Sequence, residues 1–547
     1  MKLSKSLCAA AILALFASSA PASQERLLAG PGIAVVQTKA GTLQGYVRQG
    51  IFTYKGVPYA EAERFMPPQP VAPWQGVRLA LTEGPVSLQS SDPADDIFPP
   101  HWYWPHWHPR SLPMADACQN LNVWTPGLDG KKRPVMVWLH GGGFSAGSAT
   151  VEDVYDGENL SRTGDVVVVS VNHRLNSVGF LDLSAYGEKF AQSANAGMLD
   201  IVGALEWVRD NIASFGGDPA NVTVFGQSGG GAKVLTLMAM PSAKGLFHKG
   251  IVMSGCVPLM GMTLPRPEAA RKVAERLLSD LGLTADRVGE LQTMPYDTLY
   301  RAANKAYAAV AKELPGQLFP GLGWAPVADG AVVACDPAGN AFSPLAENVP
   351  LMVGTVLSEW TSMPLLAKMA QSQSDNLNTW NVEEASRRLS GRFGGKAEAV
   401  VDAFRKAYPG KKDAAVLYVD TRLRGGAVKT AELKARQAAS VYTYVFSWET
   451  PVLGGFALAY HCAELPFVFN NIALSETSTG AGAEAFALAE KMSRAWVNFA
   501  RTGDPNGEGL PKWDAFTPEN GTAMIFDNEC VAASHHDREL QALLTAK

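Results

Sequence analysis

The chain has no excess of basic residues, and this shortage excludes one class of partner. It carries 47 Lys and Arg against 52 Asp and Glu over 547 residues, a formal net charge of −5 at pH 7. Binding to nucleic acid depends on clustered Lys and Arg that neutralise phosphates. We therefore expect no nucleic-acid partner for this protein.

Cysteines are few and widely spaced, which excludes a disulfide scaffold and a zinc ribbon. The chain has six, and no two of them form a C-x-x-C pair. Cys8 lies in an N-terminal segment that we expect to be removed, so an odd number remains and at least one thiol must be free. No metal site is predicted. The other five are Cys118, Cys256, Cys335, Cys462 and Cys530.

Long apolar runs are absent except at the start of the chain. Two lysines precede an apolar run at residues 7–17, and Ala20-Pro21-Ala22 places small residues at positions −3 and −1 of a cleavage site. The run is shorter than the roughly 20 residues that span a bilayer, although a short membrane anchor is the alternative interpretation. We expect residues 1–22 to be a cleaved signal peptide, so that the protein is secreted or periplasmic and has no membrane segment.

Ser- and Gly-rich linkers and internal repeats are also absent, so residues 23–547 are expected to form one domain. Hydrophobic residues make up 47% of the chain, which is enough for a large buried core. Residues 260–440 have a mainly helical pattern. We expect them to form helical cap-like insertions rather than a separate module.

Short β-type runs alternate with helical patterns from residue 131 onward. Apolar runs without polar interruption are typical of strands that are covered on both faces. Their alternation with helices predicts an α/β fold with a mostly parallel central sheet flanked by helices. The predicted strands are Pro134–Leu139, Asp165–Val171, Asn221–Phe225, Gly250–Ser254, Pro350–Val353 and Val441–Phe446, and a helical pattern lies between Asn195 and Phe215.

A G-x-S-x-G motif follows one of these strands, where Asn221–Phe225 runs directly into Gly226-Gln227-Ser228-Gly229-Gly230. A helical pattern comes next, and this strand–turn–helix context predicts a sharp turn that exposes a serine nucleophile. The flanking glycines allow strand and helix to approach closely. A glycine-rich turn with an incidental serine is the alternative. A phosphate-binding loop does not fit, because Val234 stands where that motif needs Ser or Thr.

A second motif supplies the oxyanion hole that a serine nucleophile requires. Leu139-His140-Gly141-Gly142-Gly143-Phe144 follows directly after a predicted strand. Loops of this type donate backbone amides to the oxyanion, and glycine suits them because the backbone itself must contact the substrate. A plain hairpin turn is the alternative, but the same chain also contains the serine turn.

The order of catalytic groups along the chain in this fold, serine then acid then histidine, narrows the choice of base. His461 follows a predicted strand and is the preferred base. His248 comes too early to leave room for an acid, and His535 and His536 lie in a polar tail. Glu359 follows another predicted strand at its C-terminal edge, although a single Glu is more often a surface charge.

The motifs together resemble those of the type-B carboxylesterases, the cholinesterase-like branch of the α/β-hydrolases. The similarity runs from about Gly41 to Asp527 and includes YKGVPYAEAERFMPPQP, LHGGGFSAGS, NAGMLDIVGALEWVRDNIASFGGDPANVTVFGQSGG, HCAELPFVF and WVNFARTGDPN. The resemblance implies an α/β-hydrolase fold, no cofactor and a small-molecule ester as substrate. It implies Ser228 as nucleophile, Glu359 as acid and His461 as base, with an oxyanion hole formed by the amides of Gly142, Gly143 and Gly229.

The chain departs from the family pattern at two positions beside the nucleophile. Gln227 stands where the family usually has Glu, and Gly229 stands where it usually has Ala. The loss of a carboxylate at Gln227 predicts that anionic substrates are tolerated, and Lys233 and Arg110 are expected to lower the electrostatic penalty further. The alternative is that both cations point into solvent.

A third departure concerns a disulfide. Ser87 replaces the first cysteine of a family bridge that would end at Cys118, so this bridge is not expected.

The stretch from Gln89 to Cys118 is rich in proline and aromatic residues. In the resembling family this region borders the active-site gorge, so Trp102, Trp104 and Trp107 are predicted substrate contacts together with Gln227. A surface loop that packs on itself is the alternative. Its histidines are expected to belong to the aromatic wall rather than to a metal site, because no carboxylate or cysteine joins them at ligand spacing. They are His101, His106 and His108.

These patterns predict a serine hydrolase that cleaves bulky or aromatic, including anionic, carboxylic esters through an acyl-enzyme. Two alternatives remain open. A cholinesterase-like binding module without catalysis would share the fold, and an amidase or acyltransferase would share the triad. The sequence does not indicate an oligomeric state.

Overall fold

The computed structural model of the chain describes residues 27–90, 113–256, 264–318, 323–361 and 375–546. The predicted signal peptide at residues 1–22 lies outside these ranges and stays a prediction. No helix in the described ranges is both long enough and apolar enough to cross a membrane.

An eleven-stranded sheet runs through the molecule in the order β18-β17-β16-β15-β14-β13-β11-β12-β10-β4-β3. Its strands are β3 (Tyr46–Arg48), β4 (Ile51–Pro58), β10 (Asn120–Thr125), β11 (Arg133–Leu139), β12 (Val167–Val171), β13 (Gly217–Gln227), β14 (Lys249–Met253), β15 (Leu351–Val356), β16 (Val441–Phe446), β17 (Thr522–Phe526) and β18 (Val531–Ser534). Small sheets are formed by β1 (Val35–Gln37), β2 (Thr42–Gln44) and β7 (Val77–Leu79), by β5 (Ala60–Glu61) and β6 (Gln69–Pro70), and by β8 (Val86–Ser87) and β9 (Met114–Ala115).

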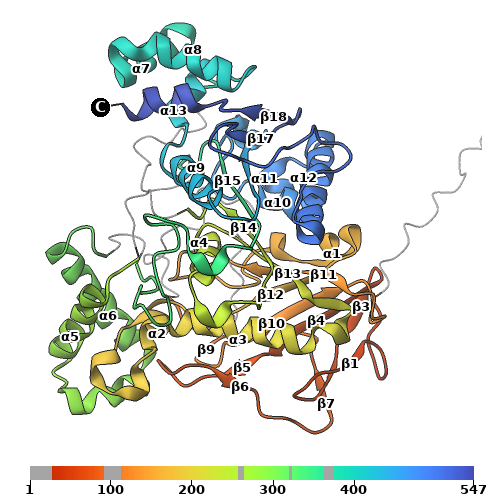
Figure 1. Ribbon diagram of the computed structural model, residues 1–547, viewed down its shortest axis with the longest axis vertical. Coiled ribbons are helices and arrows are strands. Elements are labelled where there is room, and N and C mark those ends of the chain that lie inside the picture. The colour runs from red at the N-terminus through yellow and green to blue at the C-terminus, as the bar shows by residue number, and fades with distance from the viewer. Residues whose placement is uncertain (1–26, 91–112, 257–263, 319–322, 362–374, 547) are drawn as a thin grey trace, which may run out of the picture.

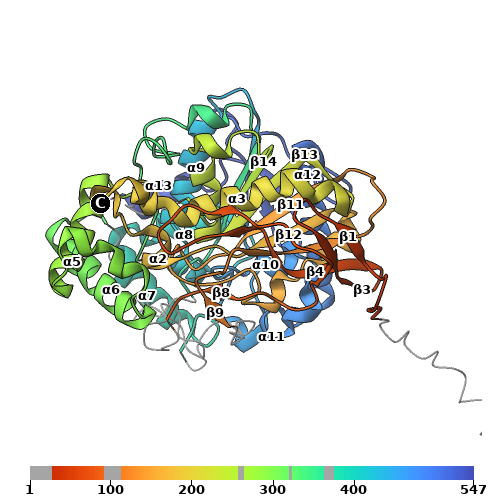
Figure 2. The ribbon, with the colours of Figure 1, turned by 90° about the horizontal axis from the view of Figure 1, so that it is seen from below.

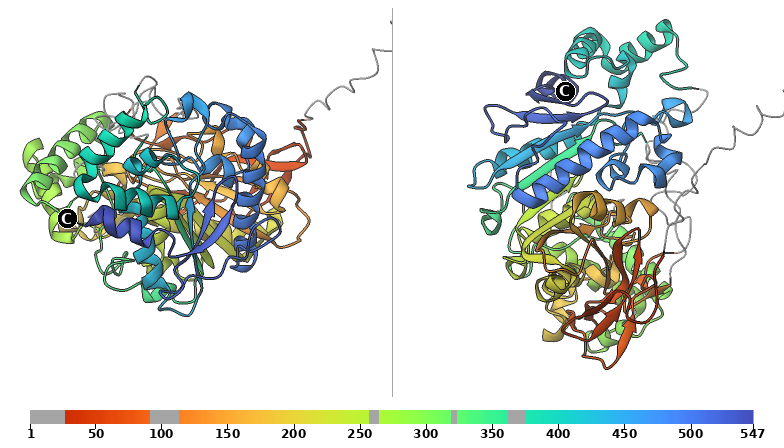
Figure 3. Two further views of the ribbon diagram at one scale, coloured as in Figure 1. Left: turned by 90° about the horizontal axis from the view of Figure 1, so that it is seen from above. Right: turned by 90° about the vertical axis from the view of Figure 1, so that its right-hand side faces the viewer.

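The sheet is parallel in its centre and antiparallel at both ends. The pairs from β12 through β11, β13, β14, β15 and β16 to β17 are parallel, whereas β3, β4, β10 and β18 join in antiparallel register. The N-terminal strands lie at one end of the sheet and the C-terminal strands at the other (Figure 3). The predicted mostly parallel α/β sheet is confirmed, because each strand predicted from the sequence overlaps a strand of this sheet and extends beyond it by at most two residues at its start and one at its end.

The helices pack on both faces of the sheet. They are α1 (Glu158–Gly164), α2 (Asn176–Phe180), α3 (Ala196–Asn211), α4 (Gly229–Leu237), α5 (Pro267–Leu281), α6 (Tyr296–Glu313), α7 (Val382–Phe393), α8 (Ala397–Ala407), α9 (Arg422–Lys434), α10 (Leu465–Val468), α11 (Glu476–Thr479), α12 (Ala483–Thr502) and α13 (Arg538–Thr545). Helices α3, α4 and α9 contribute to one core cluster, and α1, α10 and α12 contribute to the other. Figures 1 and 2 show how these helices are arranged around the sheet.

The two cores are separated by the alternation of side chains along each strand. In β11, Val135 and Val137 belong to one cluster, whereas Met136 and Trp138 belong to the other. All of these side chains have no exposed surface. Because successive residues of a strand point to opposite faces, an unbroken apolar run can fill both cores.

The helices of residues 260–440 lie in separate places, and one of them, α9, packs on the sheet itself against β15 and β16. Helices α5 and α6 pack against each other at one side of the molecule, and α7 and α8 lie at its other end beside α13 (Figure 1). Strand β15, which lies between these two pairs of helices in sequence, is an interior strand of the sheet. The expected helical insertions are present, but they flank the sheet at separate places.

The parallel strands bring five loops to one edge of the sheet. Strands β11, β13, β14, β15 and β16 point the same way, so the residues that follow them meet at the carboxyl edge. In open α/β sheets this edge is where ligands bind. The predicted nucleophile, acid, base and oxyanion loop all follow these strands.

Candidate active site

Ser228 occupies a strained turn between β13 and α4. Its backbone has φ +56° and ψ −124°, a conformation that residues with a side chain rarely adopt. The N–H of Ser228 donates to the carbonyl of Met253 at 2.8 Å, which ties the turn to the end of β14. Ser228 is half-buried and directly precedes the first turn of α4. The strain is held by the packing on both sides of the turn.

Two glycines of the motif are required by the close approach of strand, helix and loop. A Cβ added to Gly230 would lie 2.0 Å from the carbonyl oxygen of Leu139, and one added to Gly226 would lie 2.5 Å from the carbonyl carbon of Gly230. Both distances are far below van der Waals contact. The glycines of the motif are therefore required because strand, helix and loop pack too closely there for any side chain.

The glycine-rich loop after β11 lies against the serine turn. Gly142 and Gly143 have φ values of +84° and +63°, which favour glycine. A Cβ on Gly141 would lie 3.6 Å from the Cβ of Ser228, and one on Gly229 would lie 2.5 Å from the amide nitrogen of Gly143. The structure thus brings together the three residues predicted to form an oxyanion hole. Among the described residues, the amides of Gly142 and Gly143 have no hydrogen-bond acceptor.

Glu359 and His461 form a buried pair at the same edge. Nδ1 of His461 lies 2.5 Å from Oε2 of Glu359, although the residues are 102 positions apart in the sequence. Oε1 of Glu359 accepts from the Ser254 hydroxyl at 2.6 Å and from the Val356 amide at 3.1 Å. Glu359 has no exposed surface, so these donors replace the water that a free carboxylate would bind.

Gln227 lies beside the imidazole of His461. Its amide nitrogen is 3.3 Å from Nε2 and 3.4 Å from Nδ1 of the ring, and its amide oxygen accepts from the Cys462 thiol at 2.9 Å. The side chain is 1% exposed. Gln227 was predicted as a substrate-binding residue, and its contacts within the described residues are with the predicted base and with Cys462.

Two carboxyl groups buried near this site were not found from the sequence. Both oxygens of Glu464 lack a hydrogen-bond partner among the described residues, and Tyr155 donates to Glu152 at 3.2 Å. Burial raises the pKa of each carboxyl to about 8, and the charge of Glu359 adds to the effect at Glu464. Both are therefore neutral at pH 7. Glu464 lies in the HCAELPFVF stretch, but neither its position there nor that of Glu152 distinguishes a buried carboxyl from a surface glutamate.

Lys233 is fully buried behind the glycine-rich loop. Lys233 was expected to lower the electrostatic penalty for an anionic substrate, with a side chain that points into solvent as the alternative. The alternative is wrong, because the side chain is 0% exposed, and the effect on substrate charge stays a prediction. Its Nζ donates to the carbonyl of His140 at 2.8 Å. The long side chain of a helical residue leans toward the helix N-terminus, and here it reaches back from α4 to the loop.

Several predicted residues lie outside the described ranges. The predicted substrate contacts Trp102, Trp104 and Trp107 are among them, together with Arg110 and the histidines of the same loop, so their roles stay predictions. Within the described ranges, no group of three or more His, Cys, Asp or Glu side chains is placed to hold a metal ion.

The five cysteines after Cys8 are free thiols. Cys118 is buried, and Ser87 is its hydrogen-bond partner. The family disulfide that would end at Cys118 is not formed, because its first cysteine is replaced by Ser87. The Ser87 hydroxyl in turn accepts from the amide of Leu175 at 3.0 Å.

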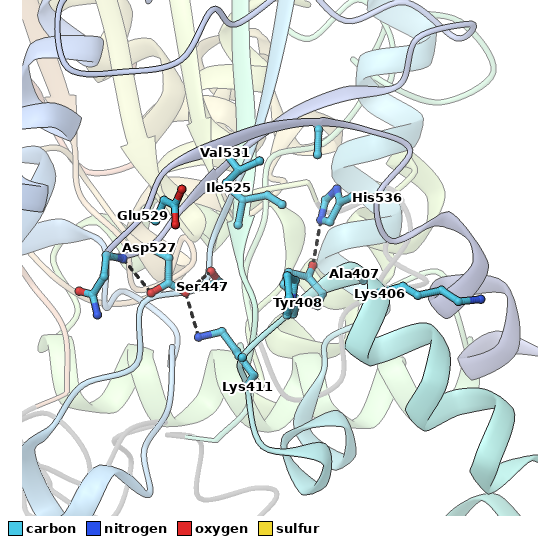
Figure 4. Close-up of a pocket in the computed structure, with 14 residues that line it drawn as sticks. Lys406, Ala407, Tyr408, Lys411, Ser447, Ile525, Asp527, Glu529, Val531 and His536 are labelled. Carbon is cyan, nitrogen blue, oxygen red and sulfur yellow. Dashed lines mark hydrogen bonds and ion pairs between the residues drawn. The ribbon is translucent and has the colours of Figure 1, made fainter.

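A pocket with a volume of about 470 Å³ lies away from this site, near the ends of β16 and β17 (Figure 4). Its charged groups pair with one another: Lys411 contacts Asp527 at 2.9 Å, and the Ser447 hydroxyl donates to Asp527 at 2.7 Å. His536 faces Tyr408 with 3.2 Å between Nε2 and the hydroxyl oxygen. Lys411, Ser447 and Asp527 thus pair with one another, and no strained nucleophile comparable to Ser228 is among the lining residues.

The chain is similar to known esterases over nearly its whole length. The model of the carboxylesterase family matches residues 33–543. Para-nitrobenzyl esterase of Bacillus subtilis is 34% identical over 92% of this chain and 97% of that protein, and phenmedipham hydrolase of Pseudarthrobacter oxydans is 31% identical over 90% and 95%. Among solved structures, an esterase from Clostridium hathewayi that can hydrolyze aliphatic aromatic polyesters is 40% identical, with a TM-score of 0.85 over 95% of this chain and 99% of that one.

Proposed function

Because this chain belongs to the carboxylesterase family and is a carboxylic ester hydrolase, we propose that Ser228, Glu359 and His461 are its catalytic triad. The main support is the 2.5 Å contact between His461 and Glu359, which lies at the same edge of the sheet as the strained turn of Ser228. These groups come from three separate strand ends. A nucleophile, a base and an acid that orients the base are the parts that acyl transfer requires.

In the proposed reaction, His461 accepts the Ser228 proton as the hydroxyl oxygen attacks the ester carbonyl. The carbonyl oxygen becomes an oxyanion, held by the amides of Gly142, Gly143 and Gly229. His461 then protonates the leaving alcohol, and an acyl-enzyme on Ser228 remains. Water, activated by His461, attacks this ester in the same way and releases the acid. Glu359 holds the imidazole in one tautomer and stabilises its protonated form.

We propose that the substrates are bulky or aromatic esters and that negative charge on them is tolerated. The relatives named above are described as acting on para-nitrobenzyl esters, phenmedipham and aliphatic aromatic polyesters, each of which contains an aromatic group. Gln227 supports the tolerance of anions because it places a neutral amide beside His461. A carboxylate at this position would repel an anionic substrate.

Export is part of the proposal. Residues 1–22 combine two basic residues, an apolar run and a small-residue cleavage site, which supports a signal peptide and a secreted or periplasmic protein.

A serine-reactive fluorophosphonate tests the function directly. We expect one stoichiometric adduct on Ser228, found by mass spectrometry of a tryptic digest, with loss of all hydrolysis of a chromogenic aromatic ester. Ser228→Ala should take up no label. Hydrolysis of the ester by a protein without an adduct on Ser228 would contradict the proposed nucleophile.

A further inference from the structure

We propose that Lys233 is a positioning residue for the oxyanion loop, and that its buried ammonium supports the negative charge that forms on the substrate. The proposal rests on the proposed esterase function. It follows from one juxtaposition: a fully buried lysine on the helix that starts after Ser228 donates to the residue that precedes the glycine-rich loop.

Lys233 contacts the glycine-rich loop, and that loop in turn contacts the serine turn. Nζ lies 2.8 Å from the His140 carbonyl and 5.7 Å from the centre of the Phe144 ring, so it contacts both ends of the loop that contains Gly141, Gly142 and Gly143. On the other side, the same loop lies against Ser228 and Gly229. Lys233 therefore holds the loop from behind.

The ammonium has no counterion in the described part of the chain. No carboxylate oxygen of a described residue lies within 4.0 Å of Nζ. A buried cation without a partner is unfavourable in the resting protein. The oxyanion that forms at Ser228 supplies the missing negative charge, so the electrostatic benefit is greatest in the transition state. A group that interacts more strongly with the transition state than with the ground state raises kcat.

The other titratable groups near Lys233 are neutral or paired. The rings of His140 and His173 stack at 5.0 Å, and the pKa of each is lowered by burial and by the charge of Lys233. The lowered pKa keeps both imidazoles neutral. Each Nδ1 donates to a backbone carbonyl, that of Gly141 at 2.8 Å and that of Arg174 at 2.9 Å. Behind His173, Arg174 pairs with Asp200 at 2.6 Å.

Both imidazoles also leave Nε2 buried without a described partner. Neutral rings with unused acceptor atoms do not compensate a charge, but they provide a polar surrounding for it. The cluster of Lys233, His140 and His173 is thus arranged to accommodate one positive charge close to the loop.

Burial lowers the pKa of Lys233 to about 7. The amine therefore loses its charge within the range in which an esterase is assayed. We expect kcat of the parent to fall between pH 7 and 10 as the ammonium is lost, in addition to the rise at lower pH that comes from the base.

The experiment compares Lys233→Met and Lys233→Arg with the parent on a neutral p-nitrophenyl ester. Methionine keeps most of the unbranched side chain without its charge, and we expect kcat to fall roughly 10- to 100-fold with KM within about twofold. Arginine keeps a charge at every pH of the assay, so most of kcat and no decline between pH 7 and 10 are expected.

Lys434→Met is the matched control. Lys434 is also 0% exposed, and its Nζ donates to the carbonyls of Ala346 and Glu347 near the start of β15, at the opposite edge of the sheet. Its substitution should leave kcat and the pH profile unchanged.

The outcomes separate this proposal from the proposed function. A parent without esterase activity would overturn the esterase function. An active parent whose Lys233→Met variant keeps kcat within about threefold, or whose alkaline decline persists in Lys233→Arg, would overturn the role of Lys233. If Lys233→Met does not fold, the pH profiles of the parent and Lys233→Arg decide the question.

Discussion

The hydroxyl of Ser254 donates to Oε1 of Glu359 at 2.6 Å, and this leaves Oε2 free to contact Nδ1 of His461. Ser254 is the residue that follows β14, whereas Glu359 comes after β15. The contact therefore joins the ends of two neighbouring strands. A buried carboxylate with both oxygens engaged has one orientation, and the imidazole that it contacts is oriented with it.

We expect Ser254→Ala to lower kcat about 3- to 10-fold with little change in KM, because Glu359 loses its strongest neutral donor and holds His461 less well. Steady-state kinetics on an aromatic ester measures this. Ser447→Ala is a matched control, since Ser447 is also a buried serine that donates to a carboxylate, at 2.7 Å to Asp527, outside the proposed triad. Equal losses in both variants would argue for a general effect on stability.

Loss of the triad members should be far more severe. Ser228→Ala and His461→Ala should each lower kcat about 10⁵- to 10⁶-fold, and Glu359→Gln about 10³- to 10⁴-fold because the wrong tautomer is favoured. Circular dichroism should show folded proteins in each case. If Glu359→Gln keeps near-normal turnover, another residue must orient His461.

Gln227→Glu tests both the pH dependence and the charge preference. A carboxylate in place of the amide that lies 3.3 Å from Nε2 of His461 stabilises the imidazolium, so the rise of kcat/KM with pH should move to higher pH, by about one unit. The same charge should improve cationic esters relative to matched anionic ones. The control is Gln192→Glu, an exposed position that adds the same net charge. An unchanged ranking of the esters would remove Gln227 as the source of anion tolerance.

Lys233→Met should stabilise the fold while it lowers activity. The pKa of Lys233 falls from 10.5 to about 7 on folding, so the folded state disfavours the proton that the unfolded chain holds. The free-energy cost of burying the charged amine has its full value below pH 7, where both the folded and the unfolded state hold the proton. It decreases as the pH rises from 7 to 10.5. The melting temperature of Lys233→Met should therefore exceed that of the parent by more at pH 6 than at pH 9. A gain that is equal at both pH values would argue against a buried charge.

Two glycine substitutions should have opposite effects. Gly230→Ala places a Cβ 2.0 Å from the Leu139 carbonyl and should prevent soluble folding. Gly391→Ala, in the exposed part of α7 where a Cβ would meet nothing within 4 Å, should stabilise the protein by about 0.5–1 kcal/mol. Expression yield and thermal unfolding measure both effects. A soluble Gly230→Ala variant with normal stability would contradict the packing of the serine turn.

Patterns of neighbouring residues carried most of what could be predicted. The apolar runs at Asn221–Phe225 and Val441–Phe446 lie within β13 and β16, and the motif around Ser228 indicated the turn between β13 and α4. Such features depend on residues close in sequence, so local chemistry is enough to reveal them.

The tertiary structure decided which distant residues meet. Ser254 belongs to no motif, and the HCAELPFVF stretch that contains Cys462 does not indicate what Cys462 contacts. Only the packing of the strands places Ser254 on Glu359 and Cys462 on Gln227. The helix that follows Ser228 likewise determined that Lys233 is buried behind the glycine-rich loop. The sequence alone thus determined the sheet, the serine turn and the class of chemistry. The fold determined the contacts that orient the catalytic side chains and set the charges around them. These contacts join residues that are far apart in the chain, and the spacing of such residues does not predict that they meet.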